Sequence, residues 1–456
     1  MIILKNDKIN LRNKRVSVLG AGKSGCAAAE LIKTIGGVPF LSDSNSKSSL
    51  DLSMYDYELN GHTYKVLDCE LIVISPGISD RISIAKEAKN IGIPIISEIE
   101  LASWYTNKPV LAITGSNGKT TTTNMLHQIF QTANLNSEIA GNIGKPFSER
   151  VKQEIISEID PDLYVIEVSS FQLEHVINFS PLIASIINIQ PDHLDRYDNF
   201  NDYIEAKINI SNNINQTDVL IYNYDDSILM KYFKNSPKNY IPFSIKSEIS
   251  PLFNFDGDKV YYYEDNTKYS LFCYDELKIK GEHNIQNAIV ASTMAKYYGI
   301  SNEIISTSLK KFEPIPHRIE FSGFINRVKC YNDSKATNYH AVSVALKSFN
   351  ESIILILGGI EKGQIHSDLL TRLKKKKIKQ IVCYGKSGRN ILRQLVDIKR
   401  AVYVNNFSNA VSTAINYCKE NDVLLLSPGC ASYDQFENYE ERGNLFKKII
   451  IEHNKK

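Results

Sequence analysis

The sequence lacks an apolar run long enough to cross a membrane, and its 7 cysteines are scattered singly, without a C-x-x-C pair. Neither disulfides nor structural zinc are indicated, and a reducing compartment fits better. The 53 basic and 51 acidic residues leave a net charge of +2, which argues against a chain-wide attraction to nucleic acid or to an anionic membrane. The apolar start at Met1 to Leu4 is too short for a signal peptide. We therefore expect a soluble, cytoplasmic protein without membrane insertion.

The length of 456 residues exceeds one ordinary hydrophobic core, so we expect about three domains. From Asp218 to Lys280, short alternating strands with turn signals at 256–257 and 265–266 predict a β-rich part, whose tyrosines we assign to hairpin packing. The run Lys374 to Lys377 has no interleaved aromatic residues, which favours a solvated helix face over a nucleic-acid site.

One stretch has the pattern of a strand, a phosphate-binding loop and a helix. Val110–Ile113 predicts a buried strand, Gly115 and Gly118 a tight turn, and Lys119 the start of a helix. Backbone N–H groups and the helix N-terminus bind phosphate oxygens, Lys119 adds a mobile positive charge, and the Thr120 hydroxyl can reach a magnesium ion. The loop lacks the first glycine of the general G-x-x-x-x-G-K-[ST] pattern and is shorter. The stretch predicts binding of a nucleoside triphosphate.

A second glycine-rich turn, G-A-G-K-S-G, occupies residues 20–25 after an apolar strand. Asp43 follows the next apolar run, at the distance where a dinucleotide-binding fold places an acid on a ribose hydroxyl. Alone, this pattern would suggest an NAD-dependent dehydrogenase, but any nucleotide diphosphate can sit on such a helix N-terminus. A further strand at 71–74 ends in a Pro-Gly turn at Gly77. The first part of the chain is thus predicted to be an anion-binding α/β module.

Polar residues follow apolar strands at further places. Glu167 ends the run from 162, and a carboxylate near a phosphate loop usually means Mg²⁺. Asn142 lies in a glycine turn, where capping of the turn is favoured over contact with a substrate. The polar cluster at 190–197 is either a solvated loop or a metal or substrate site, and the helix after it carries Lys207.

Three polar clusters follow strands in the last part of the chain, at 332–338, 358–362 and 427–432. We expect them to form one mouth of a parallel sheet. The Pro-rich stretch 313–318 before them has the composition of a linker. Asn284 and Asn287, three residues apart, share one face of a predicted helix.

With these motifs in view, the chain resembles the Mur ligase family, ATP-dependent amide ligases of peptidoglycan precursor synthesis. The family motifs are T-G-S-N-G-K-T at 114–120, E-V-S-S-F-Q-L-E at 167–174, D-H-L-D-R-Y at 192–197, H-N-I-Q-N at 283–287 and H-R at 317–318. Further stretches are similar to those of family members that add D-glutamate to UDP-N-acetylmuramoyl-L-alanine. These are N-D-S-K-A-T-N at 332–338, G-G at 358–359 with Lys362, L-S-P-G-C-A-S-Y-D-Q-F at 426–436 and the following Y-E-E-R-G.

The resemblance implies three α/β domains. These are a Rossmann-like UDP-substrate-binding domain at 1–97, a central P-loop ATPase domain with a mainly parallel sheet and a small β-rich part at 98–314, and a Rossmann-like amino-acid-binding domain at 315–456. It also implies a cytoplasmic enzyme of cell-wall biogenesis, cell shape and cell division, which we expect to be a monomer acting on small molecules.

The resemblance further assigns site residues. The expected ATP contacts are Gly115, Ser116, Asn117, Gly118, Lys119, Thr120, Thr121, Asn284, Asn287, Arg318 and Asp333. Two Mg²⁺ ions are expected on Thr120, Glu167, His193 and Lys207, with a carbamate on Lys207. The expected UDP-substrate contacts are Lys23, Ser24, Asp43, Ser44, Gly77, Asn142 and Ser169, with Asn45 where relatives commonly carry a basic residue. The expected D-glutamate contacts are Thr337, Lys362, Ser432, Tyr433 and Tyr439.

The implied reaction is stepwise: ATP phosphorylates the alanyl carboxylate, the D-glutamate amine attacks the acyl phosphate, and phosphate leaves. Lys119 and the Mg²⁺ ions offset the repulsion between the triphosphate and the carboxylate. Lys119, His193 and Lys207 are the expected catalytic residues. His193, Asp192 or bound phosphate accepts the proton of the amine, and the sequence leaves this choice open.

Three alternatives have distinct consequences. Another Mur-type or folylpolyglutamate-type ligase would use a different amino acid, although no D-N-P-R-type loop for a diamino acid is present near the C-terminal site. A dinucleotide-dependent oxidoreductase would leave the motifs from 114 to 207 unexplained. A non-catalytic nucleotide-binding scaffold would need no clustering of Lys119, Glu167, His193 and Lys207.

Overall fold

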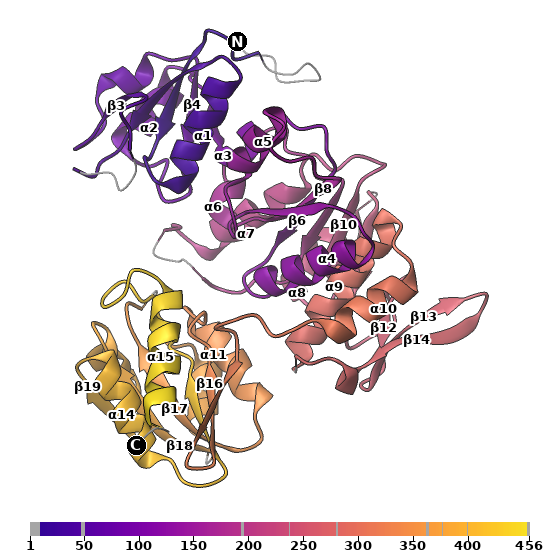
Figure 1. The fold of residues 1–456 in the computed structure, drawn as a ribbon, viewed down its shortest axis with the longest axis vertical. Coiled ribbons are helices and arrows are strands. Elements are labelled where there is room, and N and C mark those ends of the chain that lie inside the picture. The colour runs from indigo at the N-terminus through magenta and orange to yellow at the C-terminus, as the bar shows by residue number, and fades with distance from the viewer. Residues whose placement is uncertain are drawn as a thin grey trace. The chain divides into compact units, whose positions relative to one another are not determined.

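The computed structural model describes residues 10–46, 51–192, 196–236, 238–279, 281–361, 364–375, 377–398 and 400–453. They form three sheets of five or six strands and one small three-stranded sheet, with helices between the strands (Figure 1). The predicted α/β class is confirmed. By internal contacts the chain divides into a first unit, Met1–Ile189, Asn199–Leu277 and Asn284–Lys311, and a second unit, Gln190–Asp198, Lys278–His283 and Phe312–Lys456.

The first sheet lies in the first unit and is parallel throughout, in the order β3-β2-β1-β4-β5. Its elements are β1 (Arg15–Leu19), α1 (Lys23–Thr34), β2 (Val38–Ser42), β3 (Asp56–Glu58), η1 (Tyr64–Leu67), β4 (Leu71–Ile74), α2 (Ser83–Asn90), β5 (Ile95–Ser97) and α3 (Glu98–Ser103). The predicted glycine turn joins β1 to α1. Gly20 in this turn has a φ of 100°, and a Cβ atom would lie 2.7 Å from the Ser75 hydroxyl oxygen, so the position requires glycine.

The central sheet, also in the first unit, has the order β11-β10-β9-β6-β8-β7 and only parallel neighbours. Its strands are β6 (Val110–Thr114), β7 (Ser137–Gly141), β8 (Leu163–Glu167), β9 (Ile183–Ile186), β10 (Val219–Asn223) and β11 (Tyr240–Phe243). The helices are α4 (Lys119–Thr132), α5 (Phe147–Ile155), α6 (Ser170–Leu173), α7 (Phe200–Ile208), η2 (Asn209–Ser211), α8 (Ser227–Phe233), α9 (Glu282–Tyr298) and α10 (Asn302–Lys311). Every residue of β6 and β8 is buried, as expected for a parallel sheet covered on both faces.

The expectation of short alternating strands from Asp218 onward is wrong for its first part. Strands β10 and β11, with α8 between them, extend the parallel central sheet. The antiparallel part contains only β12 (Asn254–Phe255), β13 (Lys259–Glu264) and β14 (Thr267–Cys273), followed by η3 (Tyr274–Glu276). The turn at Asp265 and Asn266 has positive φ at both residues, as a two-residue hairpin requires. Tyr262 and Tyr269 stack across the hairpin with ring centroids 5.6 Å apart, so the predicted hairpin packing of tyrosines is confirmed.

Helix α3, which follows the last strand of the first sheet, is hydrogen-bonded through Glu100 to the loop before β9, within the first unit. The Glu100 carboxylate accepts hydrogen bonds from the consecutive backbone N–H groups of residues 177–179, at 2.7 to 2.9 Å. It also accepts one from the Trp104 indole at 2.8 Å. Four charge-assisted hydrogen bonds offset the desolvation of this carboxylate, so its complete burial is physically consistent.

The third large sheet lies in the second unit, in the order β15-β16-β20-β17-β18-β19. Its elements are β15 (Glu320–Ile325), β16 (Val328–Asn332), α11 (Tyr339–Ala345), η4 (Leu346–Ser348), β17 (Ser352–Gly358), α12 (Ser367–Leu373), β18 (Ile378–Tyr384), α13 (Gly388–Gln394), β19 (Ala401–Val404), α14 (Phe407–Tyr417), β20 (Asp422–Leu426) and α15 (Tyr439–His453). Helices α14 and α15 pack on one face of the sheet, against Ile354 and Ile356. Helices α11, α12 and α13 pack on the other face, against Leu355 and Leu357. Figure 1 labels α14 and α15 beside the strands of this sheet. Because β16, β20 and β17 are parallel neighbours, the three predicted polar clusters begin at adjacent strand ends.

The lysine run at 374–377 does not form a helix face. Helix α12 ends at Leu373, and the run lies in the connection to β18, with Lys376 outside the described residues. The ammonium group of Lys377 donates to the backbone carbonyls of Leu346 and Phe349, at 3.2 and 2.9 Å. Across the described ranges, no helix is both long and apolar enough to span a membrane.

Candidate functional site

The phosphate loop connects β6 to α4 and requires glycine at two positions. Gly115 and Gly118 have φ values of 158° and 88°, and a Cβ atom on Gly118 would lie 2.3 Å from the side-chain oxygen of Asn287. The ammonium group of Lys119 lies over the loop and donates to the carbonyls of Gly115 and Ser116, at 2.8 and 3.2 Å. A cation held above a helix N-terminus favours a bound phosphate group.

Thr120, Glu167 and Asn142 meet at the carboxyl ends of the central strands. The Thr120 hydroxyl donates to one carboxylate oxygen of Glu167 at 2.7 Å, and the Asn142 amide donates to the other at 2.6 Å. Capping of the glycine turn, favoured from the sequence for Asn142, is therefore wrong, because its side chain faces the carboxylate. The two hydrogen bonds fix the orientation of a carboxylate that is 1% exposed.

Lys207 reaches the phosphate loop from α7. Its side chain is only 2% exposed, and its ammonium group donates to the Gly115 carbonyl at 3.0 Å. The same group lies 4.8 Å from the ring centroid of Tyr203, whose hydroxyl is 2.8 Å from the hydroxyl of Ser116. The structure thus brings two predicted catalytic lysines, Lys119 and Lys207, to one backbone carbonyl.

The oxygen atoms of Thr120 and Glu167 suit a hard divalent cation. A magnesium ion usually keeps several water ligands and takes one or two protein oxygens together with substrate phosphates, so two protein ligands are sufficient. In the described part of the chain, no three His, Cys, Asp or Glu side chains gather as a fuller metal site. The predicted metal ligand His193 lies outside the described residues.

The remaining predicted residues of the central sheet stabilise the loop and its surroundings. The Asn287 amide donates to the Asn284 side-chain oxygen at 3.1 Å, as their shared helix face predicts. Thr121 is buried in the first turn of α4, and Ser169 caps α6 in a capping box with Gln172. Asn188, just after β9, was not predicted from the sequence, and its side chain exchanges two hydrogen bonds with the backbone of Asn117 at 2.9 and 3.0 Å. Its position at a strand end was the only available signal.

The predicted UDP-substrate residues of the first sheet lie at its carboxyl edge. Lys23 and Ser24 begin α1 after β1, Ser44 follows β2, and Gly77 follows β4, the strand beside β1. Asp43 uses both carboxylate oxygens within the chain, accepting from the backbone N–H groups of Ala21 and Asn45 at 2.7 and 2.8 Å. In this structure Asp43 therefore shapes the glycine turn from the end of β2.

In the second unit, Asp333 is buried just beyond β16. It accepts a hydrogen bond from the Ser427 hydroxyl at 2.7 Å and one from the Ile319 backbone at 3.3 Å. Burial raises the pKa of Asp333 to about 7, against the opposing effects of the Ser427 hydrogen bond and the Arg318 charge. Contact with a cationic or hydroxyl-bearing ligand would therefore favour the ionised form of the Asp333 carboxyl group.

The predicted D-glutamate residues that the structure describes all belong to the second unit. Thr337 follows β16 and is half-buried, whereas Ser432 is 3% exposed and Tyr433 is 72% exposed. Tyr439 is the first residue of α15, and its ring centroid lies 3.9 Å from the ammonium nitrogen of Lys335. Lys362 lies outside the described residues.

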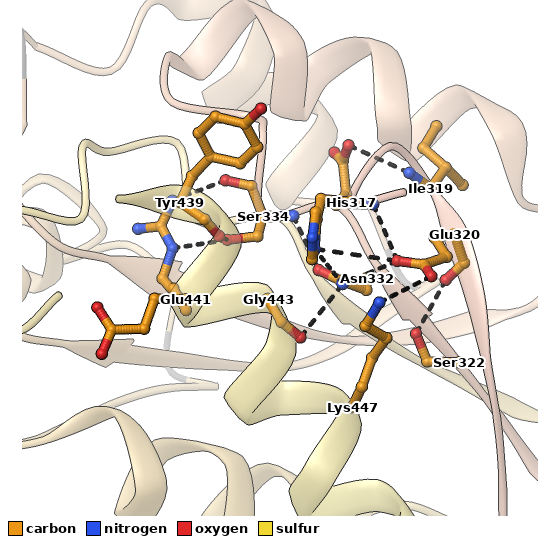
Figure 2. A network of polar contacts seen from close by, with 12 residues as sticks. His317, Ile319, Glu320, Ser322, Asn332, Ser334, Tyr439, Glu441, Gly443 and Lys447 are labelled. Carbon is orange, nitrogen blue, oxygen red and sulfur yellow. Dashed lines mark hydrogen bonds and ion pairs between the residues drawn. The ribbon is translucent and has the colours of Figure 1, made fainter. Parts of the chain in front are cut away.

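A polar network connects the linker before β15 to helix α15 (Figure 2). The Asn332 amide donates to the His317 ring nitrogen Nδ1 at 2.9 Å and to Glu320 at 3.1 Å, and Glu320 also pairs with Lys447 at 3.0 Å. Burial lowers the pKa of His317, which fits a neutral ring whose Nδ1 accepts a hydrogen bond from the Asn332 amide. A Cβ atom on Gly443 would lie 2.1 Å from that nitrogen, so the close approach of the helix requires glycine.

Family models match three consecutive parts of the chain. The MurD N-terminal domain matches residues 15–84, the Mur ligase middle domain residues 113–295, and the Mur ligase glutamate ligase domain residues 317–430. The UDP-N-acetylmuramoylalanine--D-glutamate ligase of Salinibacter ruber is 39% identical over 96% of this chain and 98% of its own. The protein of the same name from Christiangramia forsetii is 38% identical over 96% of this chain and 99% of its own.

Solved structures share the fold at much lower identity. The pseudomurein peptide ligase type C of Methanothermus fervidus superposes with a TM-score of 0.61 at 20% identity, covering 96% of this chain and all of its own (100%). The MurF ligase of Thermotoga maritima, solved in complex with ADP, gives a TM-score of 0.58 at 14% identity, covering 98% of this chain and 97% of its own. The fold of this chain is therefore found in other proteins.

Proposed function

The chain belongs to the Mur ligase family, and on this premise we propose that it is an ATP-dependent amide ligase that joins D-glutamate to UDP-N-acetylmuramoyl-L-alanine in peptidoglycan precursor synthesis. The observation that carries the proposal is the convergence of Lys119, Thr120 and Glu167 at one end of the central sheet, with Asn142 orienting the carboxylate. These are the groups that transfer of a phosphoryl group to a carboxylate needs.

The first step is attack of the alanyl carboxylate on the γ-phosphorus of ATP, which gives an acyl phosphate and ADP. Lys119 opposes the repulsion between the two anions and stabilises the negative charge that develops on the transferred oxygens. The glycine loop holds the phosphates through backbone N–H groups, so the reacting atoms are aligned before the reaction. The D-glutamate amine then attacks the acyl carbon, and phosphate leaves.

Thr120 and Glu167 would hold one Mg²⁺ ion, and Lys207, as a carbamate, would hold a second together with His193. When bound, magnesium ions lower the charge repulsion between phosphate and carboxylate. The MurF ligase solved with ADP supports adenine nucleotide use within this fold. The buried position of Lys207 beside the loop supports its assignment, since a carbamate there would turn a repelling cation into two oxygen ligands.

The remaining predicted residues are assigned to the other ligands. The residues at the mouth of the first sheet would bind the UDP moiety, and Thr337, Lys362, Ser432, Tyr433 and Tyr439 would bind D-glutamate. Arg318 and Asp333 would contact ATP. We place the domain borders at residues 97/98 and 314/315, and we propose a monomer that acts in the cytoplasm and supports cell-wall biogenesis, cell shape and cell division.

Phosphate release from ATP tests the proposal directly. Purified protein is incubated with ATP, Mg²⁺ and UDP-N-acetylmuramoyl-L-alanine, and D-glutamate is compared with L-glutamate, L-lysine and meso-diaminopimelate. We expect release only with D-glutamate, together with a product whose mass equals both substrates less one water. Equal release with a diamino acid would assign a different amino-acid substrate. Reduction of NAD without any phosphate release would remove the ligase assignment altogether.

A further inference from the structure

Arg442 is the largest side chain that the structure buries completely, with 0% exposure. Its guanidinium donates only to uncharged oxygens. The acceptors are the hydroxyl and carbonyl of Ser334 at 2.9 and 2.7 Å, the carbonyl of Cys430 at 3.1 Å, the hydroxyl of Tyr384 at 3.2 Å and the carbonyl of Gly358 at 3.5 Å. Within the described ranges no carboxylate forms an ion pair with it. Its charge does act on Asp333, where burial raises the pKa of the carboxyl group and the charge of Arg442 opposes that rise.

A buried arginine that forms no direct ion pair is costly. Arginine side chains in proteins keep their positive charge, so burial of one always carries a desolvation cost. Hydrogen bonds to carbonyl oxygens offset only part of that cost. A positive charge retained in such a place is consistent with an anion that arrives later, and the amino acid of the proposed reaction carries two carboxylates.

The three carbonyl acceptors belong to three adjacent strand ends. Gly358 is the last residue of β17, Cys430 follows β20, and Ser334 follows β16. These strands are parallel neighbours in the order β16-β20-β17. One planar group with five fixed donors thus sets the spacing of three separate segments, which a flexible ammonium group would not do.

The same segments carry the proposed contacts to D-glutamate. Thr337 lies three residues after Ser334, and Ser432 two residues after Cys430. The Ser334 hydroxyl, which accepts from Arg442, donates in turn to the carbonyl of Tyr439 at 2.8 Å (Figure 2). Each described D-glutamate contact on these loops therefore lies within three residues of a residue that accepts from Arg442 or, for Tyr439, is hydrogen-bonded to one.

We propose that Arg442 is the positioning residue of the amino-acid site: it holds the loops that bind the two carboxylates of D-glutamate at a fixed spacing, and its charge favours a dianionic amino acid there. The proposal rests on the proposed function, because it concerns the site for the same amino acid. Arg442 does not itself touch the substrate. It acts through Ser334 and the two other carbonyls, so its loss should weaken D-glutamate binding selectively.

The test compares Arg442→Lys and Arg442→Met with the wild-type enzyme, measuring KM for each of the three substrates and kcat. Lysine keeps the charge but loses the planar fork, and methionine loses both. We expect KM for D-glutamate to rise about 10-fold with lysine and about 100-fold with methionine. KM for ATP and for UDP-N-acetylmuramoyl-L-alanine should change less than about 2-fold. Arg327→Lys, at a site 81% exposed in its side chain, is the matched control and should change nothing.

Tyr384→Phe keeps the test decisive if the Arg442 variants do not fold. It removes one acceptor of the guanidinium at 3.2 Å and keeps every loop residue and the ring that fills the core, so the variant should still fold and KM for D-glutamate should rise about 5-fold. An unchanged KM for D-glutamate in folded Arg442→Lys, or in Tyr384→Phe when the Arg442 variants are unfolded, would overturn the proposal. An equal rise in all three KM values would do the same. A wild-type enzyme without D-glutamate-dependent phosphate release would instead contradict the proposed function.

Discussion

Thr120 and Glu167 join two neighbouring strand ends, since the threonine hydroxyl at the start of α4 donates to the carboxylate at the end of β8 over 2.7 Å. These two side chains are the ones that would hold a bound Mg²⁺ ion. We expect Thr120→Val to lower kcat about 100-fold and to raise the Mg²⁺ concentration needed for half-maximal phosphate release. Thr120→Ser keeps the hydroxyl and should stay within about 3-fold of the wild type. Equal activity of the valine and serine variants would contradict a metal role for this oxygen.

Lys119→Ala should separate catalysis from binding of the UDP-substrate. The ammonium group contacts the phosphate loop at 2.8 Å, whereas the UDP-substrate contacts proposed from Lys23 to Gly77 lie on the first sheet. Of the proposed UDP-substrate contacts, Asn142 and Ser169 belong to the central sheet. We expect kcat to fall by at least about 100-fold, while calorimetric titration with UDP-N-acetylmuramoyl-L-alanine gives an unchanged affinity. Lys145→Ala, which removes a partly exposed lysine paired with Glu149, serves as the control for loss of positive charge. A parallel loss of UDP-substrate affinity in Lys119→Ala would refute the division of roles between the sheets.

Lys207→Arg should be folded but nearly inactive. Arginine keeps the positive charge and the hydrogen bond to Gly115, but it cannot form the carbamate that the proposal requires. We expect activity of the wild type to fall when CO₂ is removed and to return with bicarbonate. Carbon-13 NMR after addition of labelled bicarbonate gives a second measurement, in which a carbamate signal should appear in the wild type and be missing from the variant. Full activity of Lys207→Arg would rule out the carbamate.

Glu98 gives the stability of the first unit a predictable dependence on pH. The side chain is 1% exposed, one of its oxygens has no hydrogen-bond partner, and burial raises its pKa from 4.5 to about 7. Between pH 4.5 and about 7, the folded protein therefore holds the Glu98 proton more tightly than the unfolded chain does. The contribution of protonated Glu98 to the free energy of unfolding should therefore be fully present below pH 4.5 and be lost as the pH rises through about 7.

Glu98→Gln should flatten this dependence, because the amide does not ionise. Urea unfolding at pH 5 and pH 8 should show the variant gaining up to about 3 kcal/mol on the wild type between the two conditions. Any constant cost of burying the amide cancels in this comparison. Glu87→Gln on the exposed side of α2 is the control and should follow the wild type. Identical slopes for wild type and Glu98→Gln would show that Glu98 is ionised in the folded state.

The sequence predicted those parts of the site that consecutive residues specify. The strand, glycines and lysine of the phosphate loop lie within one short stretch, and local conformational rules alone place them at a helix N-terminus. Arg442 was not predicted as a buried residue. It follows Glu440 and Glu441 at the start of a helix, a pattern typical of an exposed surface, and its burial depends on three strand ends that lie far away in the sequence.

Strand pairing was the other source of error. The apolar run in β10 is short, and such a run does not indicate whether its partner is parallel or antiparallel. Its pairing with β9, a strand across an intervening helix, decides this and extends the parallel sheet. The lysine run at 374–377 has high helix propensity, but the pairing of β18 with β17 draws the chain into a strand immediately after it.

The position of β20 has a consequence for how the protein is made. This strand lies between β16 and β17, although both precede it in the chain by several other elements. Until the ribosome has released residue 426, β16 and β17 cannot reach their final places in the sheet, and the N–H and C=O groups that later pair with β20 are open to other chains. We therefore expect the second unit to assemble late and through contacts distant in sequence, which favours slow folding and exposure to aggregation during synthesis.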